Sequence, residues 1–176
     1  MKTALVTGAK GQDAFYLTKY LLEKDYCVVL TTRNYDKLFI SNLIYEIGEI
    51  AHENKNLFFR ELSLINKEKI SELLNEFIFD EIYNLGGQSN VVESFHMEEE
   101  SENEPMNGFN NLIYNIRKSD HEIKLFQASS SEMFEDIGRN KINEHTKLNP
   151  LSPYAIGKAK VHEALINLRD QENLFL

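Results

Sequence analysis

The fold is decided by residues 3–17, TALVTGAKGQDAFYL. A short apolar run ends in a turn that contains Gly8 and Gly11, and an amphipathic segment follows at once. This order indicates a buried strand, a tight loop and a helix N-terminus, the arrangement that holds a pyrophosphate. Gly8 allows a sharp turn, and Gly11 lets backbone N–H groups approach phosphate oxygens without a Cβ in the way. Ala14 takes the third position of the glycine pattern and still allows close packing of helix on strand.

Apolar segments of strand length alternate with amphipathic segments along the rest of the chain. Strands without period-two alternation are typical of a parallel sheet covered on both faces. We therefore expect one α/β domain, residues 1–176, with a doubly wound parallel sheet in the order 3-2-1-4-5-6. The expected strands are 3–7, 27–31, 56–60, 80–85, 123–128 and the start of a sixth at 173–176; the expected helices are 13–24, 37–52, 66–77, 107–118 and 153–170.

Composition limits the classes of partner. A net charge of -9 argues against nucleic acid, and no signal peptide or membrane-length apolar run is present. The single cysteine, Cys27, lies in an apolar run and indicates a buried residue in a reducing cytoplasm. The histidines lack the spacing of ligands, so we expect no metal. The acidic run at residues 98–104 indicates a solvated loop or helix start.

Ligands of such a sheet bind beyond the carboxyl ends of its strands. Arg33 follows the second strand, where an acidic residue would bind the ribose of NAD and a cation pairs with the 2′-phosphate of NADP. The alternative is a surface arginine at a strand end. Glu61 is expected either at the adenine edge or in a solvated loop. Gly86 and Gly87 form either a plain turn or room for a cofactor.

The strongest chemical pattern is Tyr154 and Lys158, with the segment 129–132, SSSE, upstream. Residues four apart on a helix share a face. An ammonium group beside a tyrosine favours the phenolate, which accepts a proton from a substrate hydroxyl. A serine at a strand end hydrogen-bonds the same hydroxyl, and this set oxidises an alcohol by passing hydride to a nicotinamide. The alternative interpretation is an aromatic core residue beside a surface lysine.

Four stretches together resemble a known family: 7–13 (TGAKGQD), 81–91 (EIYNLGGQSNV), 128–134 (ASSSEMF) and 149–158 (NPLSPYAIGK). The chain resembles the extended short-chain dehydrogenase/reductases and, within them, the GDP-mannose 4,6-dehydratases. The resemblance implies a Rossmann-like domain that binds NADP and acts in the cytoplasm on GDP-mannose or a related nucleotide-sugar. It also makes a homo-oligomer a candidate assembly.

The resemblance also implies roles for catalytic residues. Tyr154 would take the proton of the sugar 4-hydroxyl, bridged by Ser130, and Lys158 would hold the nicotinamide ribose. Glu132 would take the C5 proton and so assist loss of the C6 hydroxyl as water. The cofactor-binding residues implied are Gly8, Gly11, Gln12, Asp13, Arg33, Glu61, Leu62, Leu85, Gly87, Ser89, Tyr154 and Lys158.

Members of the family continue for about as many residues again, with a substrate domain that we expect to be absent from this chain. Full activity is then expected to need further sequence or a partner chain. Two alternatives stand beside the dehydratase. One is an epimerase or reductase of the same superfamily, which needs no carboxylate at Glu132. The other is a non-catalytic remnant that binds NADP or another subunit.

Overall fold

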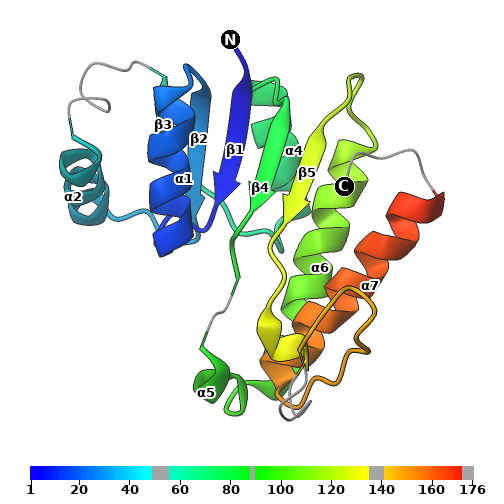
Figure 1. Ribbon diagram of the computed structural model, residues 1–176. Helices are drawn as coiled ribbons and strands as arrows, with labels where there is room; N and C mark the ends of the chain where they lie inside the picture. The colour runs from blue at the N-terminus through cyan, green and yellow to red at the C-terminus, as the bar shows by residue number, and fades with distance from the viewer. Residues whose placement is uncertain (49–55, 88–89, 135–140, 172–176) are drawn as a thin grey trace.

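A single parallel sheet organises the molecule (Figure 1). The computed structural model describes residues 1–48, 56–87, 90–134 and 141–171. Its five strands are ordered β3-β2-β1-β4-β5, which confirms the doubly wound arrangement and the expected order of these strands. The expected sixth strand at 173–176 lies outside the described residues. The strands are β1 Thr3–Thr7, β2 Cys27–Thr32, β3 Leu57–Glu61, β4 Glu81–Asn84 and β5 Lys124–Gln127.

Helices cover the two faces of the sheet. In Figure 1, α1 and α2 lie on the near face, while α4, α6 and α7 lie on the other. Among the described residues, no helix has the length and apolar character needed to cross a bilayer. The helices are α1 Gln12–Glu23, α2 Lys37–Ile47, α4 Lys67–Glu76, α5 Val91–Ser94, α6 Glu98–Ile116, α7 Pro153–Gln171 and the short 3-10 turn η1 Ser131–Phe134.

Side chains of the central strand β1 pack into two separate apolar cores, one on each face of the sheet. Leu5 packs into the core beneath α4, α6 and α7, whereas Ala4 and Val6 pack into the core beneath α1 and α2. All three side chains are fully buried. This burial on both faces explains why the strand is a continuous apolar run. Cys27, at the start of β2, is buried as expected.

Helix boundaries follow from capping residues. Asn66 caps α4 by accepting from the N–H of Lys69, as its position predicts. Of the helix expected over 37–52, α2 ends at Ile47, because Gly48 follows with a φ of +81° that stops the helical path. Residues 49–52 of that prediction lie outside the described residues. The acidic run begins α6 at Glu98, which confirms its interpretation as a helix start. Carboxylates there interact favourably with the positive end of the helix dipole.

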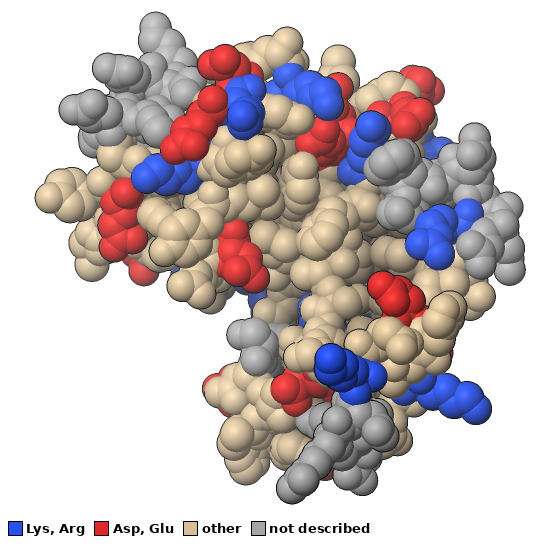
Figure 2. All heavy atoms as spheres, viewed as in Figure 1, with Lys and Arg blue, Asp and Glu red and all other residues tan. Residues whose placement is uncertain are grey.

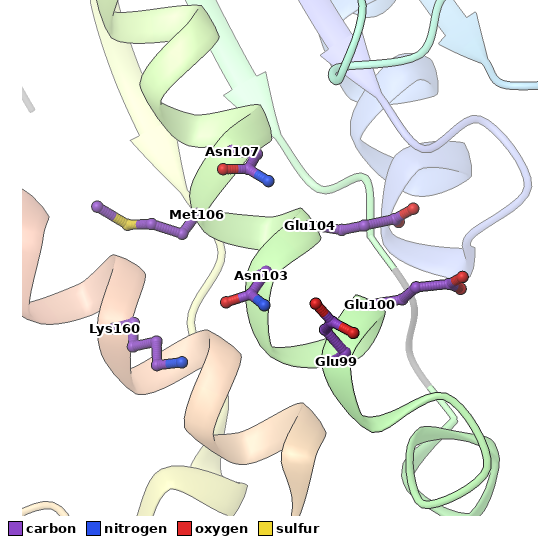
Figure 3. Close-up of a pocket in the computed structure, with 7 residues that line it drawn as sticks. All are labelled: Glu99, Glu100, Asn103, Glu104, Met106, Asn107 and Lys160. Atoms are coloured by element: carbon purple, nitrogen blue, oxygen red, sulfur yellow. The ribbon is translucent and has the colours of Figure 1, made fainter.

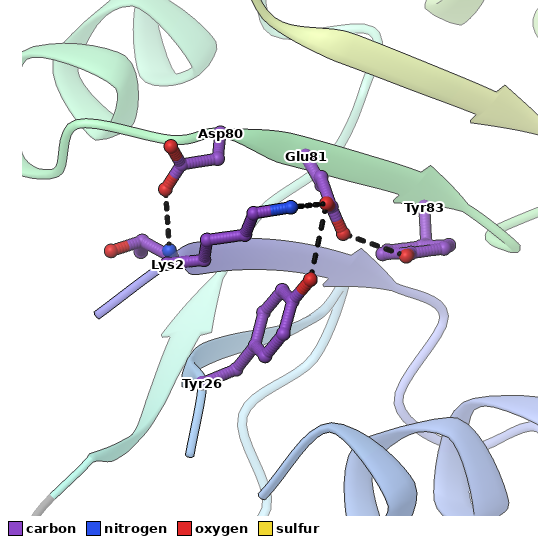
Figure 4. Close-up of polar contacts among 6 residues, drawn as sticks. Lys2, Tyr26, Asp80, Glu81 and Tyr83 are labelled. Atoms are coloured by element: carbon purple, nitrogen blue, oxygen red, sulfur yellow. Dashed lines mark hydrogen bonds and ion pairs between the residues drawn. The ribbon is translucent and has the colours of Figure 1, made fainter. Parts of the chain in front are cut away.

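Glu81 ties the amino ends of β1 and β4 together (Figure 4). Its carboxylate accepts hydrogen bonds from Lys2 Nζ at 3.0 Å, Tyr26 Oη at 3.1 Å and Tyr83 Oη at 2.8 Å. Burial raises the pKa of this carboxyl, but the three donors outweigh burial and hold the pKa below its ordinary 4.5. Burial and the adjacent Glu81 both raise the pKa of Tyr83. The cluster therefore favours an ionised Glu81 in the folded state.

Replacing Glu81 by glutamine is expected to lower the free energy of unfolding by about 1.5–3 kcal/mol at neutral pH, the range for a hydrogen bond to a charged group. Because folding lowers the pKa of Glu81, its contribution is complete above pH 4.5 and is lost as the pH falls through the folded-state pKa. Urea unfolding at pH 7 and below pH 4 measures both effects. The exposed Glu72→Gln serves as control. Equal losses in both variants, or a Glu81→Gln loss that does not shrink in acid, would contradict the role of this cluster.

Candidate active site

The loop between β1 and α1 is shaped by a close approach of two strand ends. Gly8 has a φ of +79°, and a Cβ added there would lie 2.9 Å from the Cα of Gly86. Only glycine allows β1 to end this close to the segment that follows β4. The loop closes where the N–H of Gly11 donates to the carbonyl of Gly8 at 2.8 Å.

The N-terminus of α1 faces out from this loop. Gly11 is its N-cap, and no side chain of the described residues caps it. Gln12 and Asp13 form the exposed first turn, while Ala14 is fully buried against the sheet. The N–H groups of the first turn therefore have no side-chain cap among the described residues, which is the arrangement expected at a helix N-terminus that binds an anion.

A chain of buried and part-buried hydrogen bonds joins the carboxyl ends of β1, β4 and β5. The N–H of Gly86 donates to Thr7 Oγ1 at 2.8 Å, and that hydroxyl donates to Asn84 Oδ1 at 2.7 Å. Asn84 Nδ2 then donates to Gln127 Oε1 at 2.7 Å, and Gln127 Nε2 donates to the carbonyl of Ala128 at 3.2 Å. The glycine loop and the serine-rich segment after β5 are thus fixed to one another.

Lys158 reaches the same carbonyl from α7. Its Nζ donates to the Ala128 oxygen at 3.2 Å and lies 5.9 Å from the centre of the Tyr154 ring. Burial lowers the pKa of Lys158. One turn further along α7, His162 Nδ1 lies 3.0 Å from Ser129 Oγ. The Tyr154 and Lys158 pair therefore stands at the end of β5, as the sequence predicts.

Close packing of α7 on α6 sets this position. A Cβ at Gly157 would collide with the backbone carbonyl of Ser101 in α6. The glycine between Tyr154 and Lys158 therefore allows the two helices to approach closely. Ser152 Oγ accepts from the N–H of Ala155 at 3.1 Å and caps the start of α7.

The serine-rich segment turns through η1, which α7 contacts. Ser130 Oγ accepts from the N–H of Glu132 at 3.2 Å, and both residues are half-buried. Met133 is buried beneath them, and its carbonyl accepts from the N–H of Asn149 at 2.8 Å. Ser130 and Glu132 therefore lie on one short turn beside the helix that carries Tyr154.

The ends of β2 and β3 hold the residues predicted to contact the adenosine half of a dinucleotide. Arg33 is exposed, and its Nη1 lies 3.4 Å from Glu104 Oε2 of α6. Glu61 pairs with Thr32 across the strands and accepts from the N–H of Tyr35 at 3.1 Å. Leu62 is buried, and its N–H donates to the carbonyl of Thr32 at 2.9 Å.

A cleft of about 390 Å³ opens between α1 and the ends of β4 and β5. It brings the predicted residues Asp13 and Leu85 to the serine-rich segment. Figure 2 shows that this face is largely uncharged at its centre, with charged side chains gathered toward the margins. Gly87 is exposed at the end of β4, and Ser89 lies outside the described residues. The lining residues are Asp13, Leu17, Tyr83, Leu85, Phe126, Ala128 and Ser129.

Residues 5–176 match the family model described as GDP-mannose 4,6 dehydratase. The chain belongs to this family. It is 34% identical over 178 residues to the GDP-mannose 4,6-dehydratase of Yersinia enterocolitica, covering 99% of this chain and 48% of that one. It is 30% identical to the GDP-mannose 4,6 dehydratase of Dictyostelium discoideum, covering 99% and 50%. This member of the dehydratase family thus spans about half the length of the curated relatives it matches.

Solved structures show the same fold for this dehydratase-family chain. UDP-glucose-4-epimerase from Stenotrophomonas maltophila superposes with a TM-score of 0.83 at 18% identity, covering 99% of this chain and 51% of the epimerase. The UDP-glucose 4-epimerase of Thermus thermophilus superposes with a TM-score of 0.80 at 22% identity, and the match covers 98% of this chain and 52% of that epimerase. Both structures are described with NAD.

Sequence reasoning missed the polar residues that connect the site. Thr7, Asn84 and Gln127 are each the last residue of a strand, and that position was the available signal. Glu104 stands out in the sequence only as part of an acidic run, although its carboxylate reaches the predicted cofactor residue Arg33.

Proposed function

We propose that this chain is the NADP-binding part of a nucleotide-sugar 4,6-dehydratase that converts GDP-mannose to GDP-4-keto-6-deoxymannose and water. The observation that carries the proposal is the contact of Lys158 Nζ with the Ala128 carbonyl at 3.2 Å. It places the tyrosine and lysine helix at the strand end that carries Ser130 and Glu132. Family membership supports the same chemistry.

The described residues fit a dinucleotide. Gly8 and Gly86 approach too closely for any Cβ, which leaves backbone open to a pyrophosphate beside the N-terminus of α1. Gly11, Gln12 and Asp13 would hold that group, with Leu85 and Gly87 further along the groove and Lys158 at the nicotinamide ribose. Ser89, the other residue proposed to contact the cofactor, lies outside the described residues. When bound, NADP supplies a hydride acceptor for sugar C4 and a hydride donor for C6, so no net oxidation occurs.

The side chains then divide the proton transfers. Tyr154 takes the proton of the 4-hydroxyl, which Ser130 orients by a hydrogen bond. Lys158, whose Nζ lies 5.9 Å from the centre of the Tyr154 ring, would hold the nicotinamide ribose beside this tyrosine. A ketone at C4 acidifies the C5 proton, and Glu132 takes that proton and passes it to the departing C6 hydroxyl, which leaves as water. The proton taken by Tyr154 goes back to C5 when hydride is returned to C6. Glu132 is the residue that separates this reaction from epimerisation.

We further propose NADP rather than NAD as the cofactor, because Arg33 directly follows β2, where a cation would pair with a 2′-phosphate. Glu61 and Leu62 would flank the adenine from the end of β3. The buried free thiol of Cys27 is consistent with work in the cytoplasm. The substrate would be enclosed by residues beyond this chain, as part of a longer protein or a partner subunit, with a homo-oligomer as one assembly.

The test is to incubate GDP-mannose and NADP⁺ with this chain alone and with the chain fused to the second half of the Yersinia enterocolitica relative. Mass spectrometry detects loss of one water from the sugar. We expect product from the fusion and at most traces from the chain alone. A 4-epimer without loss of water would instead favour an epimerase, and a folded, NADP-loaded fusion that leaves the sugar unchanged would contradict the proposal.

A further inference from the structure

The Arg33 side chain is engaged by a carboxylate from a distant helix. Its Nη1 lies 3.4 Å from Glu104 Oε2, which joins the end of β2 to the second turn of α6. The side chain of Arg33 is 55% exposed and that of Glu104 is 36% exposed. An ion pair this accessible to water is weak enough for another anion to displace.

Glu104 points toward the proposed dinucleotide groove. In Figure 3, Glu100 and Glu104 extend from α6 toward the loop at the start of α1, away from Lys160 of α7. The two glutamates are four residues apart and therefore share one side of the helix. Glu102 lies on another side of α6, where its Oε2 accepts from Lys160 Nζ at 3.0 Å. Of these carboxylates, Glu104 is the one that reaches a predicted cofactor contact.

We infer that Glu104 is a specificity-determining residue that weakens the preference of this chain for NADP over NAD. The inference rests on the proposed binding of a 2′-phosphate by Arg33. A dinucleotide with that phosphate must break or share the Arg33–Glu104 pair and bring two further negative charges near Glu104. A dinucleotide without it leaves the pair intact. The penalty therefore falls on NADP alone.

Calorimetric titration of the whole chain with NADP⁺ and with NAD⁺ tests the inference. Glu104→Gln is expected to tighten NADP⁺ binding by about two- to fivefold, the range that an exposed ion pair is worth, and to leave NAD⁺ binding unchanged. Glu102→Gln is the matched control, because it removes the same charge from the same helix but from a carboxylate paired with Lys160. The control is expected to change neither affinity.

A double variant, Glu104→Gln combined with Arg33→Ala, tests whether the effect of Glu104 depends on Arg33. In that background, the gain in NADP⁺ affinity is expected to disappear, since no guanidinium remains to be released. An equal gain with and without Arg33, an equal gain from Glu102→Gln, or no gain in Glu104→Gln would each overturn the inference. Failure of the proposed NADP preference has a different signature: the original chain then binds NADP⁺ no tighter than NAD⁺, and Arg33→Ala changes neither.

Discussion

Replacing Glu132 by glutamine is expected to slow loss of water from GDP-mannose by about 10²- to 10⁴-fold in the fused enzyme, the usual contribution of a general base. Glutamine keeps the size of the side chain but cannot accept the C5 proton. Binding of NADP⁺ is expected to stay unchanged, because the role assigned to Glu132 concerns the sugar and not the dinucleotide. Water loss by mass spectrometry and calorimetry measure the two effects.

The control for this variant is Glu163→Gln, an exposed glutamate on α7. It removes the same charge from an element that contacts η1, and it is expected to leave turnover unchanged. Water loss at the original rate in Glu132→Gln would sink the dehydratase assignment. That result would not affect the assignment of a dinucleotide-binding fold, and it would favour the alternative function of an epimerase or reductase.

Replacing Gly8 by alanine is expected to have the largest effect on the folded chain. The new Cβ must sit at a φ of +79° and 2.9 Å from the Cα and N of Gly86, so backbone must move. Strain of this kind costs about 1–3 kcal/mol for the conformation, and the clash adds to it. We expect a loss of stability above about 3 kcal/mol with loss of NADP⁺ binding, measured by urea unfolding and calorimetry.

Gly48→Ala is a control that measures the cost of a positive φ without a steric clash. Gly48 has a similar φ of +81°, but no atom among the described residues lies within 4 Å of a Cβ placed there. We therefore expect it to lose only the conformational part, about 1–3 kcal/mol, and to bind NADP⁺ normally. Equal losses of stability in the two variants, or full NADP⁺ binding by Gly8→Ala, would contradict the close approach of the strand ends.

Much of the fold could be predicted because its signals are local. Apolar runs such as residues 3–7 and 27–31 have the length of strands, and they alternate with helical periodicity. The ends of the helices were harder to predict, because each end depends on a single capping residue. Gly48 ends α2 before residue 52, and Asn90 starts the four-residue helix α5, which is too short to show a periodicity.

Contacts between distant residues explain what was missed in the site. Tyr154 and Lys158 could be predicted as site residues because their spacing of four residues can be recognised in the sequence. Asn84 meets Gln127 across 43 residues, and Arg33 meets Glu104 across 71. No pattern in the sequence states that such pairs touch, since only the strand order and the packing of α6 bring them together.

In the proposed function, the carboxyl edge of this sheet binds NADP, with the phosphates at the start of α1 and the nicotinamide beside Tyr154 and Lys158. Calorimetric titration of residues 1–176 with NADP⁺ measures this binding. We expect one binding site per chain, with higher affinity for NADP⁺ than for NAD⁺ and with lower affinity in Lys158→Met. Absence of binding by the folded chain, or binding that Lys158→Met leaves unchanged, would contradict the proposal.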